Sequence, residues 1–255
     1  MRRLRLLLLG SFEATLDDEP LAGIKTDKAR ALLIYLAVER ERPHRRQALA
    51  GLLWPDYPEE GARANLRHAL ANLRRALKED ENVLPFLLVE GESVQLNPES
   101  DCWLDVAEFD RSVISDPEAA LRLYRGSFLE GFSLKDSPDY DGWTAILREK
   151  YVQMASKALG RLGERYEQDG AYEPAIANAR RRLEMEPWQE EAHRSLMRLL
   201  ARGGQRSAAL VQYRTCCRLL ARELDVEPSD ETRALYEQIR DGRFQEPSGL
   251  GPMGA

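Results

Sequence analysis

The stretch EEGARANLRHALANLRRALK, residues 59–78, decides how the first half of the chain is interpreted. Its leucines recur at three- or four-residue intervals, at positions 66, 70, 73 and 77, which is the spacing of one apolar stripe along a helix. From residue 63 to residue 78 the stretch holds five Lys or Arg residues and no acidic residue. It therefore predicts an amphipathic helix that packs through its leucines and turns a basic face outward.

The polar side chains of this helix fall in three sectors of its surface when each residue is turned by about 100° from the one before it, and by the contacts that they suit they form two groups. One group suits phosphates, because Arg and Lys neutralise them; it comprises Arg63, Arg67, Arg74 and Lys78. The other group suits base edges, because Arg can bond guanine and Asn can bond adenine through two hydrogen bonds; it comprises Asn65, His68, Asn72 and Arg75. A solvated helix face that binds nothing is the competing interpretation.

The segments before this helix predict a helix-turn-helix. Two short antiparallel strands are expected at residues 4–9 and 12–16, followed by a helix that Thr26 or Asp27 caps and that Pro43 ends. A second short helix is expected over residues 45–54, so that the basic helix comes third.

Arg45 and Arg46 stand at the start of that second helix and are candidates for clamping DNA backbone phosphates. A solvated helix cap is the alternative for both. After the basic helix, residues 86–89 and 93–96 flank Glu90-Gly91-Glu92 and predict a hairpin, where a winged helix has its wing. Because the tip is acidic, contact with phosphates there would be weak or would depend on Ser93.

The second half of the chain predicts stacked helix pairs. Leu162 recurs as Leu196, and both Gly170 and Ala175 also find their own residue type 34 residues later. That period is typical of tetratricopeptide repeats, which present a concave face to a peptide or protein partner. Stabilisation of the chain or dimerisation is the alternative role. The expected helices are 106–115, 117–124, 141–168, 172–184, 190–201, 205–223 and 229–240.

Composition and motifs exclude several classes of protein. Of 255 residues, 43% are hydrophobic and 31% are charged, which suits a packed core, and no apolar run is long enough for a membrane helix. Residues 1–98 hold 15 basic and 15 acidic side chains, so the remainder carries the whole net charge of −6. The sequence has no phosphate-binding glycine loop and no paired metal ligands. We therefore expect a cytoplasmic protein with no catalytic site, cofactor or metal.

In this order, the segments resemble one family. LRLLLLGSFEATLDDEPL, KARALLIYLA, LAGLLWPD and ARANLRHALANLRRAL resemble the winged-helix domain of Streptomyces antibiotic regulatory proteins. ALRLYRGSFLEGF and the repeats beyond it resemble the bacterial transcriptional activator domain that follows in those proteins. The expected fold is mainly α with a small β component. We expect a winged helix over residues 1–98, an all-α, tetratricopeptide-like activator domain over 99–242 and a disordered tail over 243–255.

The resemblance implies an OmpR-type winged helix that binds promoter DNA, commonly as a dimer at direct repeats, and recruits RNA polymerase holoenzyme. It places the polymerase contact in the turn formed by Trp54, Pro55, Asp56 and Tyr57. Larger members add an ATPase domain that this sequence does not reach, which fits a short member or the front of a longer protein. The alternative function is an interaction adaptor whose winged helix does not bind DNA.

Overall fold

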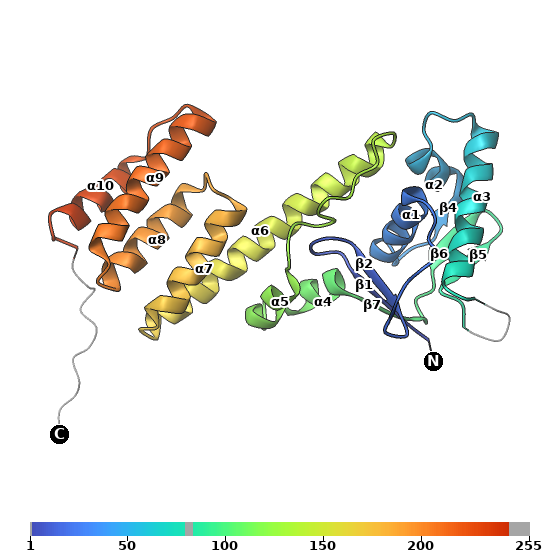
Figure 1. Ribbon diagram of the computed structural model, residues 1–255, viewed down its shortest axis with the longest axis horizontal. Coiled ribbons are helices and arrows are strands. Elements are labelled where there is room, and N and C mark those ends of the chain that lie inside the picture. The colour runs from blue at the N-terminus through green and yellow to red at the C-terminus, as the bar shows by residue number, and fades with distance from the viewer. Residues whose placement is uncertain (1, 80–83, 245–255) are drawn as a thin grey trace, which may run out of the picture. The chain divides into compact units, whose positions relative to one another are not determined.

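The computed structural model describes residues 2–79 and 84–244. It forms two compact units, Met1–Val152 and Gln153–Ala255, whose boundary falls inside the long helix α6 (Pro138–Gln168). Figure 1 shows the elements in chain order by colour. The expected domain boundaries at 98/99 and 242/243 stay predictions, and most of the expected tail, residues 245–255, lies outside the described residues.

Four short strands form the first sheet of unit 1, in the order β3-β2-β1-β7. Strands β1 and β2 are antiparallel, as predicted, whereas β7 lies parallel to β1 on its other side. Strand β7 was not predicted, because its four residues are too few to show an alternating pattern. The strands are β1 (Arg3–Leu7), β2 (Glu13–Leu16), β3 (Glu19–Pro20) and β7 (Asp101–Leu104).

A buried carboxylate joins this sheet to the chain that follows β7. Asp105 Oδ2 accepts hydrogen bonds from the backbone N–H groups of Leu8, at 2.7 Å, and Leu9, at 2.8 Å. Both donors lie directly after β1, so one side chain satisfies two backbone groups that no strand pairs with. Asp105 thereby fixes the end of β1 against the start of the next helix.

Three helices form the centre of the winged helix. The first buries residues on all sides, including Leu32, Leu33 and Ile34, and Thr26 caps its start by accepting a hydrogen bond from the N–H of Ala29. The third buries its leucine stripe, as predicted, and no leucine at positions 66, 70, 73 or 77 is more than 5% exposed. The helices are α1 (Asp27–Val38), α2 (Arg46–Leu53) and α3 (Glu59–Ala76).

The predicted hairpin is present and gains a third strand. β5 (Leu87–Glu90) pairs antiparallel with β6 (Ser93–Leu96), and β6 pairs on its other side with β4 (His44–Arg45). The two-residue strand β4 was not predicted, because it is too short to give a pattern. It ties the wing to the start of α2.

Helix α3 ends in a left-handed turn. Lys78 has φ = 51°, the N–H of Lys78 bonds Arg75 O, and the N–H of Glu79 bonds Arg74 O. This is the Schellman arrangement, in which glycine is the usual left-handed residue. The guanidinium of Arg2 donates to the carbonyls of Leu77 and Lys78, a favourable position for a cation at a helix C-terminus.

Helices α4 (Asp105–Ser112) and α5 (Pro117–Leu123) and the first part of α6 complete unit 1. The loop before α6 is held by Arg148, whose guanidinium donates to the carbonyls of Phe128, Leu129 and Phe132. Tyr140, on α6, is fully buried. These contacts fix the loop at residues 128–132 to α6 within unit 1.

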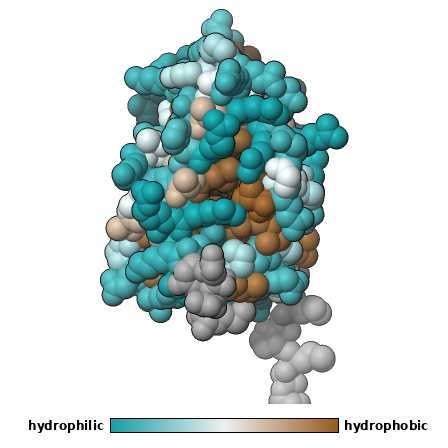
Figure 2. All heavy atoms as spheres, turned by 90° about the vertical axis from the view of Figure 1, so that its right-hand side faces the viewer, coloured by the Kyte–Doolittle hydropathy of each residue, from teal (hydrophilic) through white to brown (hydrophobic). Residues whose placement is uncertain are grey.

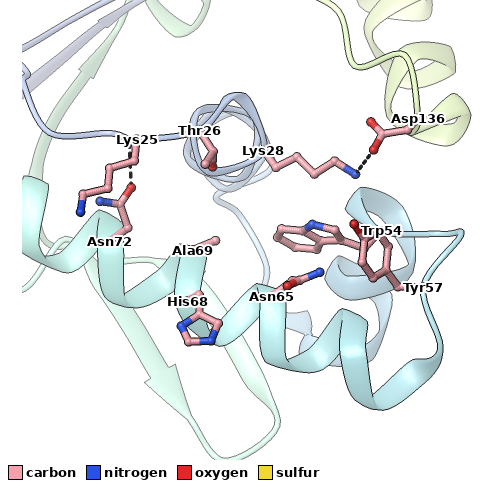
Figure 3. Close-up of a pocket in the computed structure, with 10 residues that line it drawn as sticks. All are labelled: Lys25, Thr26, Lys28, Trp54, Tyr57, Asn65, His68, Ala69, Asn72 and Asp136. Carbon is pink, nitrogen blue, oxygen red and sulfur yellow. Dashed lines mark hydrogen bonds and ion pairs between the residues drawn. The ribbon is translucent and has the colours of Figure 1, made fainter.

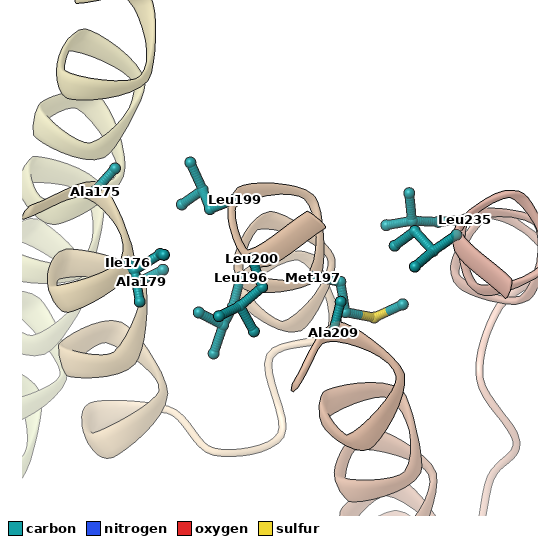
Figure 4. Close-up of a cluster of buried hydrophobic side chains, with 10 residues drawn as sticks. Ala175, Ile176, Ala179, Leu196, Met197, Leu199, Leu200, Ala209 and Leu235 are labelled. Atoms are coloured by element: carbon teal, nitrogen blue, oxygen red, sulfur yellow. The ribbon is translucent and has the colours of Figure 1, made fainter. Parts of the chain in front are cut away.

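Unit 2 continues α6 with two further helix pairs that follow the predicted period. Its cluster of buried apolar residues joins α7, α8, α9 and α10, and Figure 4 shows the side chains of α8 between those of α7 and α10. Ala175 and Ala209 are both fully buried, while Gly170 and Gly204 have φ of 72° and 74° in equivalent turns. The helices are α7 (Tyr172–Met185), α8 (Glu190–Arg202), α9 (Arg206–Leu224) and α10 (Asp230–Arg240). The prediction of a mainly helical chain with a small β component is confirmed.

Replacing Lys78 by Gly should stabilise unit 1. A left-handed residue with a Cβ costs about 1 kcal/mol that glycine avoids, so the free energy of unfolding should rise by about 0.5–1 kcal/mol. Arg75→Gly is the matched control inside α3, where glycine should instead cost about 1 kcal/mol. Urea unfolding followed by circular dichroism measures both. Destabilisation by both substitutions would contradict the assigned turn.

Acidification should weaken unit 2 through His193. This side chain is 1% exposed; Nε2 donates to Pro187 O at 2.8 Å, and Nδ1 accepts from Gln212 Nε2 at 2.7 Å. Burial lowers the pKa of His193 below its ordinary value of 6.5. The unfolded chain then binds a proton more readily than the folded one, so stability falls as pH drops below about 6.5.

Thermal unfolding between pH 7.5 and 5 checks this expectation. His193→Gln should flatten the pH dependence of the melting temperature, whatever its effect at pH 7.5. His68→Gln, which replaces an exposed histidine, should leave the dependence unchanged. An equal pH dependence in His193→Gln and the unaltered chain would show that other groups cause it.

Candidate nucleic-acid interface

The outward face of α3 brings together most of the cations that the sequence singled out. Arg67, His68, Arg74 and Arg75 are exposed on it, and Lys78 is exposed just beyond its end. Arg63, Asn65 and Asn72 are half-buried. Figure 2 shows the end of the unit that carries α3 and β5, where hydrophilic side chains surround a strip of apolar residues. Buried leucines on one side of α3 thus leave a polar face on the other.

The wing contacts this face through an ion pair. Arg63 Nη2 lies 3.0 Å from Glu92 Oε2 at the wing tip, and Arg63 Nε lies 3.9 Å from Glu59 Oε1. Arg46, Arg63, Arg67 and Glu92 line a hollow of about 80 Å³ together with Leu66 and Leu70. Three of the phosphate candidates, Arg46 from α2 and Arg63 and Arg67 from α3, therefore meet at one place, and the acidic wing tip lies among them.

A second carboxylate lies at the other end of α3. Glu79 Oε1 accepts from the N–H groups of Phe86, at 2.7 Å, and Leu87, at 2.9 Å, and Arg74 Nε lies 3.6 Å from Glu79 Oε2. Burial raises the pKa of Glu79, although the two N–H groups and Arg74 act in the opposite direction. Glu79 thus anchors the start of β5 and partly neutralises Arg74.

The opposite flank of α3 borders a larger hollow of about 460 Å³, shown in Figure 3. Asn65, His68 and Asn72 line it from α3, and Trp54 and Tyr57 line it from the turn between α2 and α3. Asn72 is engaged by the loop before α1: its Nδ2 donates to Gly23 O at 2.8 Å and its Oδ1 accepts from Lys25 N at 3.0 Å. Asn72 can therefore bond adenine through both amide atoms only by giving up these two bonds.

Sequence reasoning missed three residues that line this hollow from the start of α1 and the loop before it, namely Lys25, Thr26 and Lys28. The ammonium of Lys28 bonds Leu53 O and lies 2.7 Å from Asp136 Oδ2, and this contact lowers the pKa of Asp136. In the sequence, Lys25 and Lys28 on either side of the helix cap indicated local positive charge, but only the fold shows that they lie beside α3.

The expected polymerase-contact turn is exposed except at its first residue. Trp54 is 7% exposed, as expected of a core side chain, with the ammonium of Lys28 5.6 Å from its ring centre. Pro55, Asp56 and Tyr57 are exposed. At the wing, Ser93 is half-buried and its hydroxyl donates to Glu90 O at 3.0 Å, while Arg45 is exposed at the start of α2.

The described part of the chain contains no group of three or more His, Cys, Asp or Glu side chains placed to hold a metal ion. Within residues 2–79 and 84–244, no helix has the length and apolar character needed to cross a membrane.

A winged helix with a basic third helix, followed by helical repeats, defines a class of transcriptional regulators rather than of enzymes. The model of the bacterial transcriptional activator domain matches residues 107–240, more than half of the chain. The chain belongs to this family, and the predicted relationship to Streptomyces antibiotic regulatory proteins is confirmed.

Two curated relatives come from Mycobacterium tuberculosis. Transcriptional regulatory protein EmbR is 29% identical, over 93% of this chain and 63% of EmbR, and transcriptional regulatory protein MoaR1 is 28% identical, over 91% of this chain and 78% of MoaR1. The solved structure of EmbR in complex with a low-affinity phosphopeptide matches with a TM-score of 0.71 and 28% identity, over 95% of this chain and 66% of that one. The chain thus spans less than two thirds of the length of EmbR.

Asn72→Ala should destabilise unit 1, because it removes one donor and one acceptor that hold the loop before α1. Loss of these bonds should lower the free energy of unfolding by about 1–2 kcal/mol. Asn65→Ala is the matched control on the same helix and should change stability by no more than about 0.5 kcal/mol. If urea unfolding showed equal losses of unfolding free energy for the two substitutions, this result would contradict the structural role of Asn72.

Proposed function

We propose that the chain is a sequence-specific DNA-binding transcriptional activator whose helix α3 enters the major groove of promoter DNA. The observation that carries this proposal is the outward face of α3 on a winged-helix fold: from residue 63 onward the helix holds no acidic residue, and Arg67, His68 and Arg75 are exposed on it. An α-helix fits the major groove, where Arg reads guanine and basic side chains bind the flanking phosphates.

We assign the roles of the side chains from their places on α2 and α3. Arg67, with Arg45 and Arg46 from the start of α2, contacts backbone phosphates and fixes the position of the protein on the duplex. His68 and Arg75 read base edges, and Asn65 does so from the flank that faces the larger hollow.

Recruitment of RNA polymerase belongs to the same proposal, with Pro55, Asp56 and Tyr57 as the exposed contact residues. Two copies bind direct repeats on DNA, as in the family that the chain resembles. EmbR has been solved with a phosphopeptide. This supports a protein partner for the present chain as well, and the helical repeats are the surface that we assign to it.

Fluorescence anisotropy tests DNA binding. The full chain is titrated onto a labelled duplex from the region upstream of its own gene, and onto a scrambled duplex of the same composition, at several salt concentrations. Tighter, salt-dependent binding to the first duplex is the expected result. Absence of binding to both duplexes at low salt would overturn the proposal in favour of an interaction adaptor.

Arg67→Gln should weaken binding to both duplexes by the same factor. Loss of one phosphate contact should also reduce the slope of log K against log salt by about one. Arg122→Gln is the charge-matched control, because Arg122 is exposed on α5, outside the winged-helix elements. An Arg67→Gln slope equal to that of the control would exclude a phosphate contact at Arg67.

A further inference from the structure

The wing tip is fixed against the start of α2 by its backbone. His44 pairs with Val94 and Arg45 with Ser93, so β4 and β6 are in register up to the tip. The N–H of Arg46 then donates to Glu92 O at 2.8 Å. These backbone contacts fix the position of the Glu92 backbone. From there the Glu92 carboxylate reaches Arg63, with Oε2 3.0 Å from Arg63 Nη2.

The place that this carboxylate occupies is built for an anion. Arg46, Arg63 and Arg67 line the same hollow of about 80 Å³, and Leu66 and Leu70 line it with apolar surface. Arg46 Nε is buried and has no hydrogen-bond acceptor among the residues that the structure describes. Three guanidinium groups thus line one small hollow with a single carboxylate from the wing, and among the described residues that carboxylate pairs with Arg63.

We propose that this hollow is a subsite for a DNA backbone phosphate, and that Glu92 holds the place of that phosphate until DNA binds. The inference rests on the proposed DNA-binding function. A phosphodiester and a carboxylate each carry one negative charge and two acceptor oxygens, so both suit the same guanidinium groups. Binding of DNA exchanges Glu92 for a phosphate oxygen at Arg63.

This exchange acts on every duplex alike. The carboxylate competes with a phosphate, which is the same in all sequences, so Glu92 lowers affinity for DNA in general. Contacts between α3 and base edges are untouched by it. Glu92 therefore reduces binding to random DNA without reducing the preference for the correct site over a random one.

The test compares two glutamates of the same wing. Glu92→Gln removes the carboxylate that pairs with Arg63, while Glu90→Gln removes an equal charge from an exposed side chain that forms no ion pair within residues 2–79 and 84–244. Binding of a scrambled duplex is measured by anisotropy at about 50 mM salt, where phosphate contacts dominate. We expect Glu92→Gln to bind about tenfold more tightly than the unaltered chain and Glu90→Gln about twofold more tightly. Thermal melting verifies that both variants are folded.

A double-mutant cycle with Arg63→Gln assigns the gain to the ion pair. In the Arg63→Gln background, Glu92→Gln should gain no more than Glu90→Gln does. If Glu92→Gln and Glu90→Gln gained equal affinity for the scrambled duplex in the original background, the loss of one negative charge would explain both gains. This result would overturn the inference. Weaker binding by Glu92→Gln would overturn it as well.

The scrambled duplex separates this inference from the proposed function. Equal affinity of the unaltered chain for native and scrambled duplexes would contradict sequence-specific binding, yet a tenfold gain in Glu92→Gln would still support the phosphate subsite. Absence of binding to either duplex by the unaltered chain and by Glu92→Gln would overturn both.

Discussion

Burial of the leucine stripe of α3 is the constraint on which the proposed interface depends. Leu73 and Leu77 are fully buried. A helix with one apolar stripe buries that stripe and leaves its other faces in water. Because the cations lie on the remaining faces, packing of the core alone turns them outward. The wing, the start of α1 and the α2–α3 turn are then arranged around a helix whose rotation is already fixed.

Carboxylates that hold the winged helix together also reduce the charge of its basic face. Glu79 anchors the start of β5 through two backbone N–H groups and lies 3.6 Å from Arg74, and Glu92 at the anchored wing tip lies 3.0 Å from Arg63. The net charge of the first 98 residues, which is zero, does not reveal this arrangement. What matters for an anionic partner is which cations have an internal carboxylate and which, like Arg67, face water.

The sequence predicted the elements that repeat a residue pattern at regular intervals over a long stretch. The leucine spacing located α3, because the same face of the helix is buried at each turn. The 34-residue period of Ala175 and Gly170 located the repeats, because successive helix pairs pack in the same way. The two-residue strand β4 and the parallel strand β7 were missed, since strands this short leave no alternation to detect. The bonds of Asn72 were missed for another reason: Gly23 and Lys25 approach it only after the chain has folded.

Internal carboxylates pair with some of the cations beside α3, and this pairing has a consequence for recognition. Each phosphate contact adds to affinity for all DNA equally, so a regulator with many such contacts is distributed over the large excess of non-specific sites. A chain that pairs Arg63 and Arg74 internally limits this general term and leaves base contacts by side chains such as Arg75 to decide where it binds. Acidic residues beside a recognition helix are then compatible with DNA binding, because they lower affinity for wrong sites as much as for the right one and keep the ratio between them.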